Sequence, residues 1–247
     1  MKMLDGKTVL VTGAGLGVGR AIALACAEAG ANVAVNDIGA TLHGDPSGDS
    51  PAAKVTQEIQ SAGGNAITLT DSIADWNAAH SMIETTIKAF GSIDALINNA
   101  GNLRDVIFHK MSEEDFDAVI NVHLKGCFNM SRAAAPYFKE HGGGALLHMT
   151  STSGLVGNFG QANYCAAKLG IVGLSKAIAL DMQRFGVRSN AVAPFAWTRM
   201  VSSIPTDTPE QQARVDGLKK LVPERLAPFA VAMCSDNAEH VTGQVFG

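Results

Sequence analysis

The sequence is poor in charge and has no long apolar run, and these two absences exclude several classes of protein. Charged residues make up 17% of the 247 residues, below the usual quarter, which predicts that other subunits cover part of the surface. The net charge of −4 gives no electrostatic argument for binding nucleic acid or an anionic membrane. No apolar run approaches the ~20 residues of a membrane span.

Cysteine is also scarce. Cys26, Cys127, Cys165 and Cys234 lie far apart in apolar, helix-like surroundings. They show neither the spacing of metal ligands nor a disulfide framework, so we expect no metal site and four reduced, buried thiols. Residues 1–7 contain no apolar signal core before the first strand pattern begins. The expected location is the cytoplasm.

Short apolar segments alternate with longer segments of helical period along the whole chain. This order predicts an α/β fold, a Rossmann-type doubly wound parallel sheet of about seven strands with helices on both faces. No repeat or linker interrupts it, so we expect one domain over residues 1–247. In such sheets ligands bind beyond the carboxyl ends of the strands. The predicted strands are 8–11, 33–36, 66–69, 93–97, 145–149, 187–193 and 244–246.

Two breaks in this pattern carry further predictions. A helix is expected from Ser112 to Phe138, with a break before Asn121. Residues 194–224 contain Pro205, Pro209 and Pro223 and are predicted to be irregular. An irregular segment of this length in a compact domain is usually a lid or a binding loop.

The first strand leads into a glycine-rich turn, Thr12 to Gly19, and then into a helix. Glycines allow the backbone to approach a pyrophosphate, and the start of the helix supplies N–H groups and a positive dipole. A glycine run alone also fits a tight turn with no ligand. Because strand, turn and helix occur in the right order here, we favour phosphate binding. The predicted binding residues are Gly13, Gly15, Leu16, Gly17 and Gly19.

Two aspartates follow predicted strands. Asp37 ends the second strand, 18 residues after Gly19, close to the spacing of a carboxylate that binds the ribose of NAD. The alternative is a turn residue before Gly39. Asp71 follows the third strand and is expected either to face adenine or to cap the next helix.

Tyr164 and Lys168 follow a loop that enters a helix near Gln161. Their spacing of four places both side chains on one helical face. A nearby ammonium favours the phenolate form, so we expect the pKa of Tyr164 to be lowered and its oxygen to exchange a proton with an alcohol or ketone. An isolated pair of this spacing is more often a half-buried tyrosine beside an exposed lysine.

The wider pattern resembles the short-chain dehydrogenase/reductase family over nearly the whole length. The matching segments are Thr12-Gly13-x-x-x-Gly17-x-Gly19, Asn98-Asn99-Ala100-Gly101, Ser151, Tyr164-x-x-x-Lys168 and Asn190-x-Val192-x-Pro194. Within the family, Val35-Asn36-Asp37, Leu103-Arg104-Asp105, the stretch from Gly157 to Tyr164 and Thr198-Arg199-Met200 resemble the (3R)-hydroxyacyl-CoA dehydrogenase part of peroxisomal multifunctional enzymes type 2 and their bacterial relatives. Some of those enzymes accept 17β-hydroxysteroids.

The resemblance implies an NAD-dependent oxidoreductase that acts on a secondary alcohol or ketone and forms a homodimer or homotetramer. It implies Tyr164 as general acid/base, Lys168 on the ribose hydroxyls and Ser151 as donor to the substrate oxygen. It further implies cofactor contacts at Asn99, Ala100, Gly101, Pro194 and Thr198. His123 stands where the family usually has asparagine, and Phe195 where glycine usually follows Pro194. His123 is therefore expected to serve through its backbone carbonyl or its imidazole.

Two other functions remain open. A 3-oxoacyl-acyl-carrier-protein reductase would use NADPH, which Asp37 disfavours. A non-catalytic dinucleotide sensor would not need Ser151, Tyr164 and Lys168.

Overall fold

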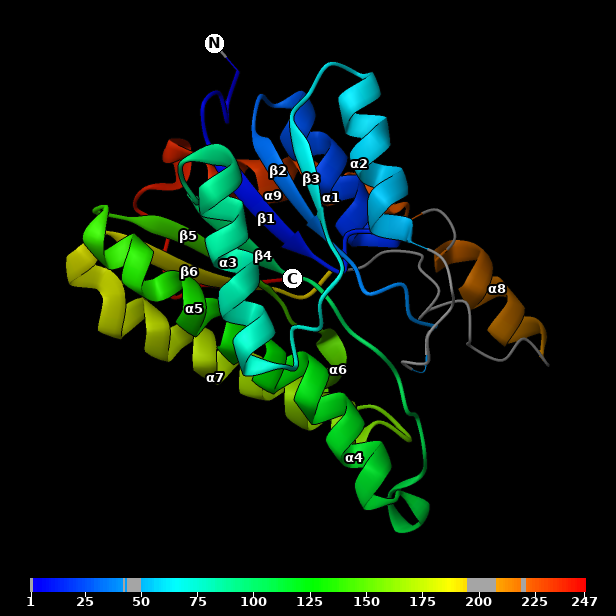
Figure 1. The fold of residues 1–247 in the computed structure, drawn as a ribbon. Helices are drawn as coiled ribbons and strands as arrows, with labels where there is room; N and C mark the ends of the chain where they lie inside the picture. Colours follow the sequence, from blue (N-terminus) through cyan, green and yellow to red (C-terminus); the bar gives the residue numbers. More distant parts are fainter. Residues whose placement is uncertain (1, 42, 44–49, 195–207, 219–220) are drawn as a thin grey trace.

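The computed structural model describes residues 2–41, 43, 50–194, 208–218 and 221–247. Seven parallel strands form one sheet in the order β3-β2-β1-β4-β5-β6-β7. This order is that of the predicted doubly wound sheet (Figure 1). The strands are β1 Thr8–Thr12, β2 Asn32–Asn36, β3 Ala66–Leu69, β4 Ala95–Asn98, β5 Gly144–Met149, β6 Val187–Val192 and β7 Val245–Phe246.

Helices cover both faces of the sheet, and each layer packs on its own apolar core (Figure 1). One core joins the sheet to α1, α2 and α9. The other joins it to α3 and α5, with α7 packed beside them. The helices are α1 Gly17–Glu28, α2 Pro51–Ser61, α3 Trp76–Phe90, α4 Glu113–Ile120, α5 Gly126–Glu140, α6 Thr152–Val156, α7 Ala162–Met182, α8 Pro209–Leu218 and α9 Ala227–Cys234.

Burial of the strands explains why they could be predicted from the sequence. Every residue of β1 and β4 is buried, as expected for a parallel sheet covered on both faces. None of the helices in the described ranges is long and apolar enough to cross a membrane.

Two expectations need correction. The 194–224 segment is not irregular throughout, because α8 occupies Pro209–Leu218; residues 195–207, 219 and 220 lie outside the described part. Cys165 is half-buried, whereas the other three cysteines are buried as expected; all four are free thiols. The break expected before Asn121 in the helix from Ser112 is confirmed, because α4 ends at Ile120. A π-helical turn, Asn121–Lys125, joins α4 directly to α5.

The start of α4 matches its prediction in detail. Ser112 caps the helix, and its hydroxyl accepts the N–H of Asp115 at 3.1 Å. The Asp115 carboxylate reaches back to the N–H of Ser112 at 3.3 Å. This reciprocal cap fixes where the chain turns back toward the sheet after the loop that follows β4.

Candidate active site

A cavity of about 560 Å³ opens at the carboxyl edge of the sheet. Most of the residues singled out in the sequence meet there, although they come from seven separate segments. Gly15 and Asp71 do not line the cavity, and Thr198 lies outside the described residues. The predicted residues in its lining are Gly13, Leu16, Gly17, Gly19, Asp37, Asn99, Ala100, Gly101, His123, Ser151, Tyr164, Lys168 and Pro194.

The glycine turn forms one wall and fits a phosphate. Gly13 and Gly17 have φ values of 62° and 55°, which favour glycine. A side chain at Gly19 would bring its Cβ within 2.2 Å of the Gly13 carbonyl oxygen. At the start of α1 no described side chain caps the helix, and its first turn holds no acidic residue. Its N–H groups and dipole are therefore directed at the cavity without a competing carboxylate.

The Asp37 carboxylate is held by the backbone at the end of β2. Its Oδ2 accepts the N–H of Gly15 at 2.9 Å, and its Oδ1 accepts the N–H of Gly39 at 2.9 Å. Gly15 thus fixes Asp37, and a side chain at Gly15 would bring its Cβ within 2.8 Å of that carboxylate. Asp71 is exposed, and α3 is capped by Asp75 in its place.

The segment after β4 is fastened to the glycine turn. The Asn99 amide donates to the carbonyl oxygens of Thr12 at 2.9 Å and Gly13 at 3.0 Å. The Thr12 hydroxyl accepts the N–H groups of Asn99 at 3.0 Å and Ala100 at 3.1 Å. Two neighbouring strand ends therefore form one rigid floor.

Tyr164, Lys168 and Ser151 meet where β5 ends against α7. The Lys168 Nζ donates to the Met149 carbonyl oxygen at 2.6 Å and lies 5.5 Å from the centre of the Tyr164 ring. Ser151 lines the same cavity, and its side chain acts to lower the pKa of Tyr164. The Thr150 hydroxyl donates to the Lys168 carbonyl oxygen at 2.7 Å, which locks the strand end to the helix.

The electrostatics of this trio differ from the sequence-based expectation. The pKa of Tyr164 is raised to about 12, mainly by burial and to a smaller extent by the Asp105 carboxylate, while the Ser151 side chain opposes the rise. Burial also lowers the pKa of Lys168 to about 8. The expected lowering of the tyrosine pKa is therefore absent in the free protein, because removal of the phenolate from water outweighs the nearby ammonium.

His123 lies in the π-helical turn with 2% of its surface exposed. Its Nε2 lies 2.8 Å from the carbonyl oxygen and 3.1 Å from the backbone nitrogen of Asn102. The ring meets the Tyr164 ring edge to face at 5.2 Å. Burial, with a smaller contribution from Lys168, holds the pKa of His123 well below its usual range, so the imidazole is neutral. It packs on Gly101, where a Cβ would lie 2.2 Å from its Cε1.

Several residues in the lining were not proposed as site residues from the sequence, and two of them carry side chains that can bind a ligand. His43 and Arg104 line the same cavity as Asp37. The sequence around Arg104 does not predict its contact with His43, because the two residues are brought together only by the order of the strands in the sheet. Among the described residues, no group of three or more metal-ligating side chains is placed to hold an ion.

The sequence and the fold both match known proteins. A family model described as short chain dehydrogenase matches residues 7–208. Peroxisomal multifunctional enzyme type 2 of Mus musculus is 44% identical over 239 residues, covering 97% of this chain and 31% of that protein. A 3-oxoacyl-acyl-carrier-protein reductase of Staphylococcus aureus is 38% identical over 246 residues, covering 99% of this chain and 96% of that protein.

A solved 7α-hydroxysteroid dehydrogenase, complexed with NADH and 7-oxo glycochenodeoxycholic acid, matches the fold with a TM-score of 0.88. It is 31% identical, and the match covers 98% of this chain and 92% of that one. This chain spans about a third of the mouse enzyme, so the likeness concerns one part of a longer protein. The family match over most of the chain, together with these relatives, confirms the resemblance read from the motifs: the chain belongs to the short-chain dehydrogenase/reductase family, whose members are oxidoreductases.

Proposed function

We propose that the protein is an NAD-dependent dehydrogenase, one domain over residues 1–247, that transfers hydride between nicotinamide and a secondary alcohol or ketone. The observation that carries the proposal is that Ser151, Tyr164 and Lys168 share one cavity with the glycine turn and Asp37. A site for proton transfer and a cradle for phosphate and ribose thus open on the same space. When bound, the oxidised nicotinamide supplies the hydride acceptor and a positive charge that favours phenolate.

Tyr164 is the proton-transferring group in this proposal. In the oxidation direction its phenolate oxygen takes the hydroxyl proton of the alcohol as the carbon gives up its hydride. In the reverse direction the phenol returns that proton to the ketone oxygen. Ser151 donates its single hydroxyl proton to the substrate oxygen once substrate is bound, while the buried Lys168 adds positive charge beside the Tyr164 ring.

Asp37 supports the choice of NAD. With both carboxylate oxygens fixed by backbone N–H groups, their remaining lone pairs can accept the ribose hydroxyls. The 2′-phosphate of NADP would face this negative charge instead. Asn99, Ala100, Gly101 and Pro194 line the same cavity. Thr198 remains a proposed contact from the family resemblance, and Asp71 one from its position after β3.

Exposed apolar side chains near Ser151 and Tyr164 in the chain support the proposed substrate class. Leu155, Val156 and Phe159, which lie between Ser151 and Tyr164 in the chain, are 45%, 85% and 84% exposed. Such a surface suits the apolar part of a (3R)-hydroxyacyl-CoA or of a 17β-hydroxysteroid-type molecule. The mouse relative bears the name of a peroxisomal multifunctional enzyme, and the matching solved structure holds a steroid.

The reductase alternative rests on the Staphylococcus aureus relative. It predicts a preference for NADPH, against which the Asp37 carboxylate argues. A dinucleotide sensor without catalysis is disfavoured because it gives no reason for Ser151, Tyr164 and Lys168 to meet.

We also propose a homodimer or homotetramer in the cytoplasm. Phe128 on α5 and Leu169 and Leu180 on α7 are 44%, 53% and 76% exposed. Large apolar side chains on neighbouring helices suit a two-fold contact between copies. Sedimentation that finds only monomer at micromolar concentration would contradict this part of the proposal.

The proposed reaction is tested by initial rates with NAD on a panel of hydroxyacyl-CoA thioesters, hydroxysteroids and simple alcohols. We expect turnover of an acyl-CoA or steroid alcohol well above that of simple alcohols, abolished in Tyr164→Phe and retained in the matched Tyr137→Phe. Equal rates for the two tyrosine variants, or no turnover with any member, would overturn the assignment.

A further inference from the structure

Two loops on opposite sides of the cavity are joined by a pair of hydrogen bonds. The His43 Nδ1 lies 3.1 Å from the Leu103 carbonyl oxygen. The Arg104 Nε donates to the His43 carbonyl oxygen at 3.0 Å. His43 belongs to the loop after β2 and Arg104 to the loop after β4. We call this contact the 43–104 bridge.

The strand order places this bridge above the glycine turn. In the sheet, β1 lies between β2 and β4, so loops that leave the carboxyl ends of β2 and β4 can meet only across the end of β1. The turn that follows β1 carries Gly13, Gly17 and Gly19, and these line the cavity together with His43 and Arg104. A dinucleotide whose phosphates lie at the start of α1 would thus be covered by the bridge.

Arg104 brings positive charge to this position. Its Nε is used by the bridge, while no ion pair found in the described part of the chain involves its guanidinium. Two described carboxylates in neighbouring segments have other hydrogen-bond partners. Asp37 accepts two backbone N–H groups, and Asp105 accepts the Gln161 amide at 2.7 Å. The terminal amino groups of a guanidinium match phosphate oxygens in geometry and charge.

The Arg104 backbone is anchored to the catalytic helix. Its carbonyl oxygen accepts the Asn163 amide at 2.9 Å, and Asn163 is fully buried. The Asn163 side-chain oxygen in turn accepts the N–H of Tyr164 at 2.7 Å. The position of Arg104 over the cavity is therefore fixed relative to the tyrosine by two successive hydrogen bonds.

We propose that Arg104 is a cofactor-binding residue that contacts the pyrophosphate from the side opposite the glycine turn, and that the 43–104 bridge must open before the cofactor leaves. The family pattern of glycines and Asp37 does not include this contact. The inference rests on the proposed placement of the dinucleotide across the end of β1, and it is independent of the substrate.

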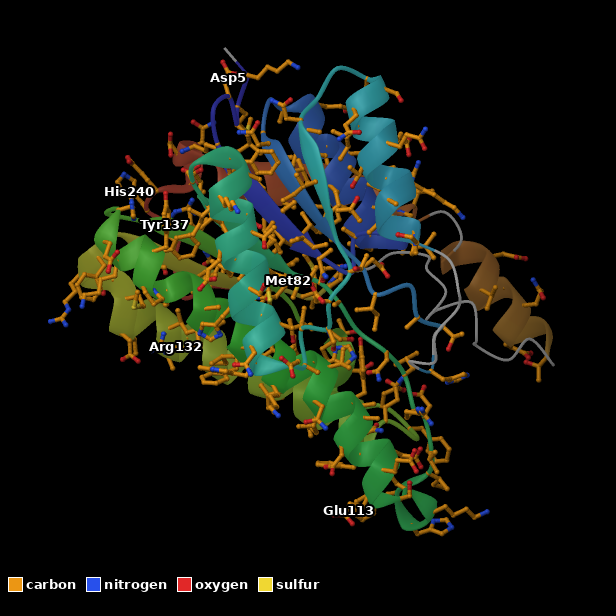
Figure 2. All side chains as sticks on the ribbon, in the orientation of Figure 1. Asp5, Met82, Glu113, Arg132, Tyr137 and His240 are labelled. Atoms are coloured by element: carbon orange, nitrogen blue, oxygen red, sulfur yellow. The ribbon has the colours of Figure 1, made fainter. Side chains whose placement is uncertain are left out.

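The test compares Arg104→Gln with the matched control Arg132→Gln, whose side chain is exposed on α5 outside the cavity lining (Figure 2). Binding of NADH, ADP and adenosine is measured by fluorescence titration and competition, without turnover. Because Arg104→Gln loses a hydrogen bond to a charged group, it should bind NADH and ADP at least ~10-fold more weakly than the wild type does. Adenosine, which lacks phosphate, should bind all three proteins equally, and this equality also shows that the variant is folded.

Stopped-flow release of NADH tests the bridge itself. We expect Arg104→Gln to release NADH faster than the wild type. Arg104→Lys should change the affinity for NADH less than Arg104→Gln does, because lysine keeps the charge but loses the planar guanidinium. Unchanged ADP affinity in Arg104→Gln would overturn the inference while leaving the proposed function standing. If the wild type bound neither NADH nor ADP, the proposed function and the inference would both be refuted.

Discussion

Replacing Lys168 by methionine tests whether the catalytic lysine destabilises the folded protein. Its side chain is buried, and burial lowers its pKa from 10.5 to about 8. Because one pKa unit corresponds to ~1.4 kcal/mol, holding the charge in the folded state costs ~3 kcal/mol. The cost is complete below pH 8. It disappears as the pH rises to 10.5, because the folded protein releases the proton before the unfolded chain does.

Lys168→Met keeps a side chain of similar length and removes the charge. It also leaves the Met149 carbonyl oxygen without the donor at 2.6 Å, which opposes the gain by ~1–2 kcal/mol. The net expectation is an inactive variant that is ~1–2 kcal/mol more stable near pH 7. At ~2–4 °C per kcal/mol for a chain of this size, its Tm should rise by ~2–8 °C. At pH 10.5 the gain should vanish and the lost hydrogen bond should leave the variant slightly less stable.

The assay is thermal and urea unfolding of the protein without cofactor, at pH 7 and at pH 10.5. Lys176→Met is the matched control, since Lys176 is exposed on the same helix and its loss should change stability by less than ~0.5 kcal/mol. The titration of the buried cysteines occurs in every variant and largely cancels in the differences. A Lys168→Met protein that is equally destabilised at both pH values would refute the reasoning.

Three further outcomes are expected. Tyr164→Phe should lose at least ~100-fold in turnover with cofactor affinity retained; turnover within a few-fold of wild type would remove Tyr164 from its role. His123→Asn should lower the free energy of unfolding by ~1–3 kcal/mol, because one Asn102 backbone group loses its partner. It should leave the pH–rate profile near neutrality unchanged, because the imidazole is already neutral; a displaced profile would instead assign it a proton relay. Asp105→Asn should lower the pKa of Tyr164, read from phenolate absorbance in a Tyr137→Phe background where Tyr164 is the only tyrosine; an unchanged or higher pKa would contradict the role of that carboxylate.

The sheet was predictable because its strands are buried on both faces. A run such as Thr8–Thr12 must be apolar or β-branched throughout, and glycines mark the turns that follow. Helix α8 was missed because few of its residues are apolar and prolines surround it. The π-helical turn at His123 was read as a break, because the sequence does not distinguish a widened helical turn from a loop.

The candidate site was predictable as a set of residues, but its electrostatics were not. The spacing of Tyr164 and Lys168 says that both face one side of α7, yet it does not say how deeply they are buried. Burial decides the direction of both pKa changes. The contact between His43 and Arg104 depends on the position of β1 between β2 and β4, and no local pattern encodes it.

The choice of cofactor is the central claim, and paired steady-state kinetics with NAD and NADP test it most directly. A charged hydrogen bond contributes ~1.5–3 kcal/mol, and each ~1.4 kcal/mol is a factor of ten. The wild type should therefore prefer NAD by roughly 10- to 100-fold or more in kcat/KM. Asp37→Ala should shrink that preference, chiefly by weakening the use of NAD. A wild type that prefers NADP would contradict the role of Asp37 and favour the reductase alternative.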